Sequence, residues 1–469
     1  MKKIIIAIAV IAAVGLVGPK FTGNAINQKI DNIIANINQM PGYRASIKNR
    51  ETSWFSSSAV IKVGLDAAMF ADAGLAATQM EMFKNLNSEL NFTAQHGPFL
   101  TLNGFGFGLS AWKIETAEKT LREVLSYDKN KIFYTMTGNI GLFGGANFAD
   151  NIPEFSLILQ DDLAAESAFS GWNGSGTASS DSFSYRGEIE SFVMSNDMMS
   201  VDVKSVKWDS VLNASWASAL QGEFYDSAGS FTIGLINFDL PELGVKTGIE
   251  SFVIDVETMK SDDGALMDVN MDYALKSIDL PYFKARDLII KTQFKHLEKE
   301  FFKAYQEATA KPSEIEQAMA EIIKNKLLPQ LQAAPELNIT EMSGKIADGK
   351  FSGKILTKLV GIDSLPNSLE DPGFWISKVF VDSKLEADKP MAMWIGEQVV
   401  VSQIQADPNA AQMTKEEIKS MAAQQVDGVI TGLTEQGMIT VTADGSYEIV
   451  FTMQDGQALL NGKTMPLPF

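Results

Sequence analysis

Alternation of apolar and polar residues is the feature that most limits how this chain can fold. From Met267 to Leu275 the odd-numbered residues are all apolar, and Asp268, Asn270 and Asp272 lie between them. Successive side chains of a β-strand point to opposite faces of the sheet, so this period of two predicts a strand with one buried and one solvated face.

The same period recurs in shorter runs between residues 43 and 290. The runs are Leu90–Ala94, Phe105–Leu109, Phe231–Leu235 and, in a shifted phase that indicates a bulge or bend, Ile236–Leu240. Segments rich in Asn, Asp, Gly and Ser separate the runs and predict turns at Asn173–Gly176, Asp226–Gly229 and Asp262–Gly264. Many short strands at hairpin spacing predict large antiparallel sheets rather than a doubly wound parallel fold.

Helical periodicity becomes frequent after residue 290. Apolar stripes with a period near 3.6 predict helices beginning at Phe294, at Lys311–Glu314 with Pro329 as its end, and after Thr414. Thr414 and Glu417 form a Thr-x-x-Glu capping box. Beyond Gly437, the apolar alternation on both sides of Asp444-Gly445 predicts a hairpin, followed by a last strand near 458–460.

The expected fold class is therefore α+β and strand-dominated, with large antiparallel sheets that are curved or sandwich-like, a few amphipathic helices and an N-terminal membrane helix. The expected segments are 1–20 as a membrane anchor or signal segment, 21–42 as an amphipathic linker helix, 43–290 as an antiparallel β-rich region and 291–469 as an α+β region. The boundary near 290 is soft, because the last two regions can form one continuous unit.

The first twenty residues predict a membrane segment. Lys2 and Lys3 precede a continuous apolar or glycine stretch from Ile4 to Gly18, and Lys20 closes it. The sixteen uncharged residues from Ile4 to Pro19 would span about 24 Å as a helix, against a hydrocarbon core of about 30 Å. The positive-inside rule places the two lysines in the cytoplasm and the body outside it, in a chain that crosses once. The alternative is a cleaved signal peptide.

Composition excludes several classes of function. The net charge of −19 argues against a nucleic-acid partner, which needs a basic face. The chain has no cysteine and only two histidines, His96 and His296, so we expect no cofactor and no metal site, and we assign no catalytic residue.

Motifs for known chemistry are weak. Gly104, Gly106 and Gly108 alternate with phenylalanines and are not followed by a helix start, which argues against a dinucleotide cradle. Ser126 and Lys129 have the spacing of a Ser/Lys acyl-transfer pair but lack its partner motifs. The acidic pairs Asp161-Asp162 and Asp262-Asp263 fit solvated turns better than paired catalytic carboxylates or calcium ligands.

One cluster remains of interest, His96-Gly97-Pro98-Phe99. Gly-Pro favours a turn, and a histidine can bond the backbone carbonyls that a turn leaves unpaired. We interpret the cluster first as a structural turn and second as part of a ligand or catalytic site.

Four segments in this order resemble the YdgA family of uncharacterised bacterial envelope proteins. They are Trp54–Ser57, His96–Phe99, Met271–Ile278 and Ala458–Lys463. The resemblance implies a Gram-negative inner-membrane protein with its body in the periplasm. It supplies no catalytic residues, because the family has no agreed activity.

We therefore expect a non-enzymatic, membrane-anchored periplasmic protein whose sheets present an apolar groove to a lipid or another apolar ligand. The 28 Phe and 21 Met residues suit such a lining, although core packing uses both more often. One alternative is a scaffold that binds other envelope proteins. Another is a carboxylate-dependent hydrolase in which two acidic side chains converge with His96 or Ser126.

Overall fold

The computed structural model describes residues 30–32, 34–35, 37–38, 43–65, 87–97, 99–116, 126–128, 130–159, 165–196, 198–215, 223–280, 283–309, 315–406 and 413–467. The chain divides into two compact units. Unit 1 comprises Met1–Gly244 with Thr309–Ser313, and unit 2 comprises Val245–Ala308 with Glu314–Phe469. The predicted membrane segment, residues 1–20, lies outside the described residues. Among the helices that are described, none has both the length and the apolar character needed to cross a bilayer.

Unit 1 is built from strands that follow one another along the chain. They are β1 Tyr43–Thr52, β2 Ser56–Leu65, β3 Asn87–His96, β4 Phe99–Leu100, β5 Gly106–Phe107, β6 Ser110–Thr116, β7 Thr135–Ile140, β8 Ala146–Ile152, β9 Phe155–Leu159, β10 Ala165–Phe169, β11 Trp172–Ala178, β12 Phe183–Ser195, β13 Ser200–Asn213 and β14 Asp226–Leu240. A short 3-10 helix, Pro241–Leu243, follows β14.

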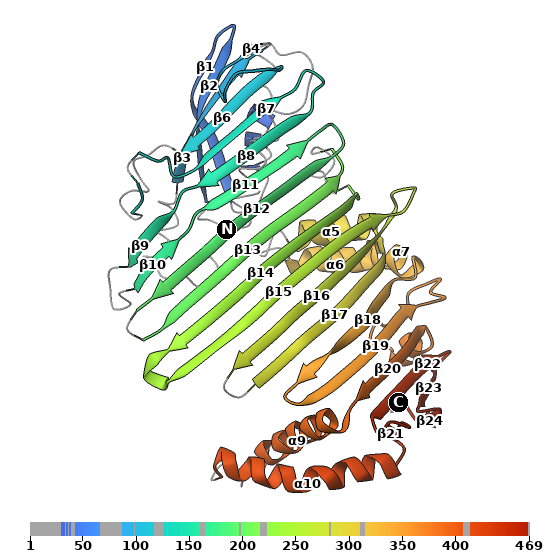
Figure 1. Ribbon diagram of the computed structural model, residues 1–469. Coiled ribbons are helices and arrows are strands. Elements are labelled where there is room, and N and C mark those ends of the chain that lie inside the picture. The colour runs from blue at the N-terminus through green and yellow to red at the C-terminus, as the bar shows by residue number, and fades with distance from the viewer. Residues whose placement is uncertain are drawn as a thin grey trace. The chain divides into compact units, whose positions relative to one another are not determined.

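The pairing in unit 1 is antiparallel and mostly sequential, as the alternation predicts. The main order is β1-β2-β3-β6-β7-β8-β11-β12-β13-β14 (Figure 1). The long strand β12 pairs with β11 along its first half and with β10 along its second half, and β9 pairs with β10. Strands β4 and β5 form a separate ribbon.

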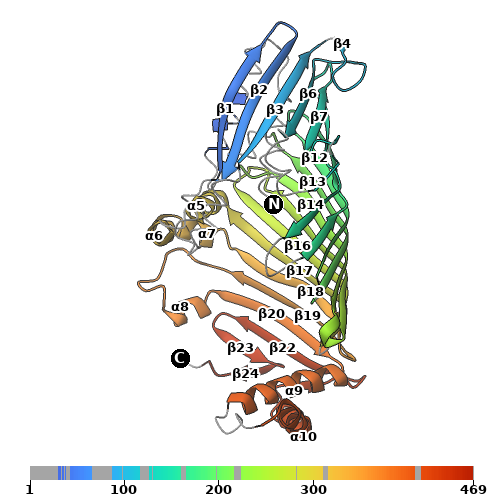
Figure 2. The same ribbon diagram turned by 90° about the vertical axis from the view of Figure 1, so that its left-hand side faces the viewer.

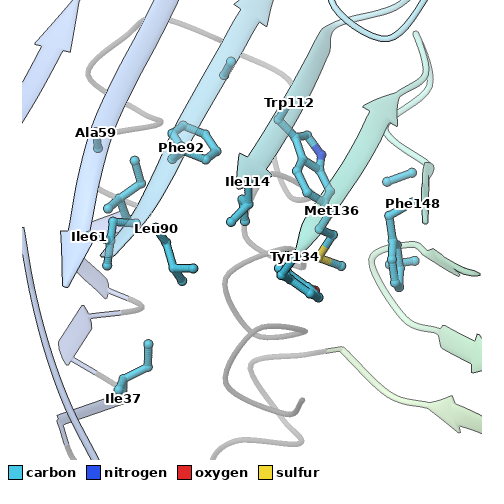
Figure 3. Packing of buried hydrophobic residues seen from close by; sticks show 14 of the residues in the cluster. Ile37, Ala59, Ile61, Leu90, Phe92, Trp112, Ile114, Tyr134, Met136 and Phe148 are labelled. Atoms are coloured by element: carbon cyan, nitrogen blue, oxygen red, sulfur yellow. The ribbon is translucent and has the colours of Figure 1, made fainter. Parts of the chain in front are cut away.

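One face of unit 1 carries a hydrophobic core. Buried side chains from successive strands line up there, among them Ile61, Phe92, Ile114, Met136 and Phe148 (Figure 3). The described residues between 30 and 38 are helical, and two isoleucines of the predicted amphipathic helix, at positions 30 and 37, are buried in the same core. Burial of one apolar face is the main source of stability for such a sheet.

Unit 2 contains the longest strands. They are β15 Val245–Lys260, β16 Leu266–Leu280, β17 Phe283–Glu298, β18 Glu336–Ile346, β19 Gly349–Leu359, β20 Val379–Ala387, β21 Thr440–Val441, β22 Tyr447–Gln454, β23 Gln457–Leu460 and β24 Lys463–Met465. Their antiparallel order is β15-β16-β17-β18-β19-β20-β22-β23-β24, with β21 beside β22, and Figure 1 shows β15 to β20 side by side. The predicted terminal hairpin and the strand near 458–460 are confirmed, but that strand is not the last, because β24 follows it and pairs with it.

The described helices of unit 2 are α5 Lys299–Thr309, α6 Ile315–Asn325, α7 Leu327–Gln332, α8 Pro372–Ile376, α9 Lys389–Ala406 and α10 Lys415–Glu435. The capping box predicted at Thr414 is present, and the side chain of Thr414 accepts from the backbone N–H of Glu417. The helix predicted from Phe294 begins only at Lys299, because β17 continues to Glu298 and pairs there with β16.

Four other predictions about turns, a strand and a helix end were wrong. Asn173–Gly176 lies inside β11 and Asp226–Gly229 lies inside β14, so neither segment is a turn. Of the predicted strand Phe105–Leu109, only Gly106–Phe107 is a strand. Pro329 does not end a helix. It lies in the first turn of α7, where its missing N–H costs no hydrogen bond.

Candidate functional site

The structure brings together, in unit 1, two of the four segments that resemble YdgA proteins. Ser57, from Trp54–Ser57, and His96, from His96–Phe99, are both buried, and Ser57 Oγ lies 3.2 Å from His96 Nε2. The backbone N–H of His96 donates to the carbonyl of Phe55 at 2.8 Å. Burial lowers the pKa of His96 below its ordinary value, although a hydrogen bond to the Trp54 backbone acts in the opposite direction.

This geometry supports the structural interpretation of His96. The imidazole joins the end of β3 to the β1–β2 turn and the start of β2, and its described partners are a hydroxyl and backbone groups rather than a carboxylate. Gly97 is required because a side chain there would collide with the Gly108 carbonyl. Pro98 lies outside the described residues, and the Phe99 side chain is 62% exposed.

The other chemical candidates are not brought together in the part of the chain that the structure describes. Ser126 pairs through its backbone with Ser156, and its proposed partner Lys129 lies outside the described residues. Asp262 and Asp263 occupy the turn between β15 and β16, where Asp263 caps its own turn by accepting from the Ser261 hydroxyl and the Ala265 N–H. The pair Asp161-Asp162 is also outside the described residues.

Alternation in unit 2 produces an extended apolar surface, which we call the apolar face. Residues that pair directly across antiparallel strands lie on the same side of the sheet. Two rows of paired residues define the face: Ile254, Tyr273, Ile290, Met342, Gly353, Leu385 and Ile449, and beside them Val256, Met271, Thr292, Ile339, Ile355, Ser383, Phe451 and Leu460. The first row crosses seven strands, which corresponds to about 29 Å at a spacing of ~4.8 Å.

The side chains of the apolar face are only partly buried. Nearly all of them are half-buried, and Ile290 is 43% exposed. Leu337, which pairs with Phe294 on the same side of the sheet, is 51% exposed. Contiguous apolar surface of this extent is uncommon on a monomeric protein and is typical of interaction sites.

The opposite face of the same strands carries ion pairs and is the more polar of the two, although Val253, Ala274 and Ile289 form one apolar row on it. Ion pairs between neighbouring strands join Lys291 to Glu341 at 3.0 Å, Lys354 to Asp382 at 3.2 Å and Lys384 to Glu448 at 2.6 Å. Each of these charged residues is offset by one position from a residue of the apolar face. The sheet of unit 2 is therefore amphipathic, with charged side chains concentrated on the face opposite the apolar face.

A second site that sequence reasoning missed is a buried polar cluster in unit 1. Asp150 accepts hydrogen bonds from the Tyr185 hydroxyl at 2.9 Å and from Trp172 Nε1 at 3.0 Å, and Tyr134 also bonds to it. Burial raises the pKa of Asp150, although these hydrogen bonds act in the opposite direction. The sequence does indicate that Asp150 points inward, because it lies two residues after the buried Phe148 on the same strand and therefore on the same face.

The donors and acceptors of the Asp150 cluster satisfy one another, which suits a structural network better than a ligand site. Among the residues that the structure describes, no group of three or more His, Asp or Glu side chains is placed to hold a metal ion. The arrangement with the clearest binding capacity is therefore the apolar face of unit 2.

Comparison with known proteins gives a family but no activity. A family model described as "Bacterial protein of unknown function (DUF945)" matches residues 1–468. No curated protein and no solved structure matches the chain. Since the family model spans nearly the whole sequence, this chain belongs to the DUF945 family of bacterial proteins of unknown function.

Proposed function

We propose that this protein is a non-enzymatic envelope protein that binds a lipid, or another elongated apolar ligand, on the apolar face of unit 2. The observation that carries the proposal is the half-exposed apolar surface that crosses seven strands, backed by a polar face of ion pairs. Flexible methionines such as Met271 and Met342 let such a surface adapt to chains of different shape.

The proposed location is the periplasmic side of the bacterial inner membrane. Its support is the N-terminal pattern of Lys2 and Lys3 before the apolar stretch Ile4–Gly18, together with the bacterial family. The resemblance of four ordered segments to YdgA proteins is consistent with this location. A membrane tether would keep the apolar face near a source of lipid.

The test is native mass spectrometry of the full-length protein, released from the membrane in detergent and freed of detergent in the gas phase, which separates specifically bound lipid from bulk bilayer lipid. We expect lipid to co-purify with the wild type. Ile290→Asp introduces a charge on the apolar face at a half-exposed position, and it should reduce bound lipid at least about threefold because burying an unpaired charge against acyl chains is costly.

The matched control is Ala274→Asp, which adds the same charge to the neighbouring strand but on the polar face. It should leave lipid binding unchanged. A wild-type protein free of lipid, or equal losses in the two variants, would reject the proposal.

The scaffold alternative draws on the same half-exposed surface, which another envelope protein could cover. Crosslinking in intact membranes separates the two ideas, because a reproducible protein partner without bound lipid favours the scaffold. The hydrolase alternative requires two carboxylates near His96 or Ser126, and the described partners of His96 include none.

A further inference from the structure

One end of unit 1 carries six exposed aromatic side chains and one exposed leucine on three separate turns. We call the set the aromatic tip: Trp54, Phe55, Phe99, Phe105, Phe107, Leu142 and Phe143. Every member is more than half exposed, with Trp54 at 86%, Phe105 at 76% and Phe143 at 102%. Large apolar side chains at this exposure indicate that the surface functions in contact with something other than water.

Strand pairing places the three turns at the same end of the sheet. Thr52 pairs with Ser57 at the β1–β2 turn, His96 with Ser110 across the segment after β3, and Ile140 with Ala146 at the β7–β8 turn. Figure 2 shows the β1–β2 turn and β4 at this end of unit 1. The turns belong to neighbouring strands β1 to β8, so the tip forms a row about 24 Å long at ~4.8 Å per strand.

The backbone that presents the rings is held in place. Gln95 Oε1 accepts from the N–H groups of Thr101 at 2.7 Å and Leu102 at 2.9 Å. Asn103 Nδ2 donates to the carbonyls of Trp112 at 3.0 Å and Gly138 at 2.9 Å. The exposed rings of Phe99, Phe105 and Phe107 therefore project from a loop that side-chain hydrogen bonds hold in place.

The rings of the tip also contact one another. The Phe99 and Phe107 rings lie 5.3 Å apart, and those of Phe105 and Phe107 lie 5.5 Å apart. Three phenylalanines thus form one protruding apolar group at the end of the loop.

Charge is absent from the sequence around the tip. Residues 52–61, 97–112 and 132–149 contain no Asp, Glu, Lys, Arg or His, in a chain whose net charge is −19. Uncharged loops that end in Trp and Phe suit the interfacial zone of a bilayer, where aromatic rings partition and charges are costly. A protein partner would need a separate pocket for each protruding ring, whereas a bilayer accepts them without complementary shape.

We propose that the aromatic tip inserts into the interfacial region of a lipid bilayer and gives the protein a membrane contact separate from its N-terminal segment. This contact does not depend on ligand binding by the apolar face. This shallow insertion would hold the end of unit 1 at the membrane surface.

The absence of native cysteine allows a direct test with full-length protein. Phe143→Cys is labelled with an environment-sensitive fluorophore, and the protein is reconstituted in vesicles of phosphatidylcholine with spin-labelled lipid. Glu154→Cys is the control, since Glu154 is an exposed residue just beyond β8 at the other end of the same strands. We expect a blue-shifted emission at position 143 and quenching by the lipid spin label at least about fivefold stronger than at position 154.

A second variant adds Phe99→Ser, Phe105→Ser and Phe107→Ser to Phe143→Cys. The rings are exposed, so the unfolding midpoint should stay the same while the quenching at position 143 falls to the control level. Three outcomes would overturn the proposal: equal quenching at positions 143 and 154, no effect of the three serines, or a blue shift that appears without vesicles and grows with protein concentration. The last would show that a second copy of the chain covers the tip.

Discussion

Glycines inside strands of unit 1 provide space for aromatic rings. A side chain at Gly187 would collide with the Trp172 indole, and one at Gly174 would collide with the Asp150 carboxylate and the Tyr185 hydroxyl. This close approach explains why Asn173–Gly176, which is typical of a turn, forms the middle of a strand. Composition alone could not reveal it, because the reason lies on neighbouring strands.

Gly187→Ala should therefore destabilise the protein by about 1–3 kcal/mol through overpacking against Trp172. Gly229→Ala is the control, because a methyl group there has ordinary contacts only, and it should be neutral or stabilising by about 0.5 kcal/mol. Urea unfolding of the three proteins checks this. Equal free energies of unfolding for the two variants would contradict the packing argument.

His96 predicts a pH effect on stability. Its pKa in the folded protein is below 6.5, chiefly because burial disfavours the imidazolium, so the unfolded chain takes up a proton more readily than the folded one. The contribution of His96 to the free energy of unfolding is therefore greatest at pH values above about 6.5. It decreases as the pH falls below that value, because the unfolded chain then takes up the proton first.

His96→Gln keeps a polar group at the position but cannot titrate. Between pH 7.5 and 5.5 the wild type should lose more stability than this variant, as measured by urea unfolding at each pH. The comparison between the two proteins removes the contribution of other titrating groups, including Asp150, whose raised pKa acts in the opposite direction. Parallel pH profiles would show that His96 does not titrate on unfolding.

At the scale of elements, single residues with a left-handed backbone conformation interrupt the long strands, and the apolar side chains change face there. In unit 1, Ser205 has a φ of 56° and lies beside Gly234, where an added Cβ would be 2.9 Å from the Ser205 Cβ. Gly234 lies close to the point between Leu235 and Ile236 where the apolar alternation of β14 changes phase, as the sequence predicts. In unit 2, Ser251 and Asp287 have φ values of 50° and 51° on strands that both pair with β16.

The left-handed backbone at Ser205 gives a matched pair of variants. A left-handed backbone costs a residue with a side chain about 1–2 kcal/mol, and β-branched residues tolerate it least. Ser205→Gly should leave stability unchanged or raise it by up to about 1 kcal/mol, and Ser205→Val should lower it by about 1–2 kcal/mol. Thermal unfolding would show the difference, and a valine variant as stable as the glycine variant would show that the left-handed backbone at Ser205 does not cost stability.

Some elements could be predicted from local signals and others could not. Strand β16 and helix α10 follow their residue patterns, since alternation and a capping box are local. Helix α9 was missed because its apolar residues surround the helix, with Val400 buried and Val399 46% exposed. The end of β17 was misplaced because pairing with β16 outweighs the helical period around Phe294.

At the scale of the whole molecule, the alternation predicts two faces but not what covers them. The faces of unit 2 were expected to be one wet and one buried, and the second is instead half-buried. Coverage depends on which other segments pack against the sheet, and a period of two contains no such information. The binding site proposed for this protein is therefore visible only in the assembled structure.

The most direct test of that site is photocrosslinking in living cells, with a photoreactive amino acid at Leu337 on the apolar face or at Ala274 on the polar face. Mass spectrometry of the purified protein identifies what each position touches. We expect a lipid adduct at Leu337 and none at Ala274, because only the first side chain lies where acyl chains would bind. Lipid adducts at both positions, or none at Leu337, would contradict the claim that the apolar face binds lipid.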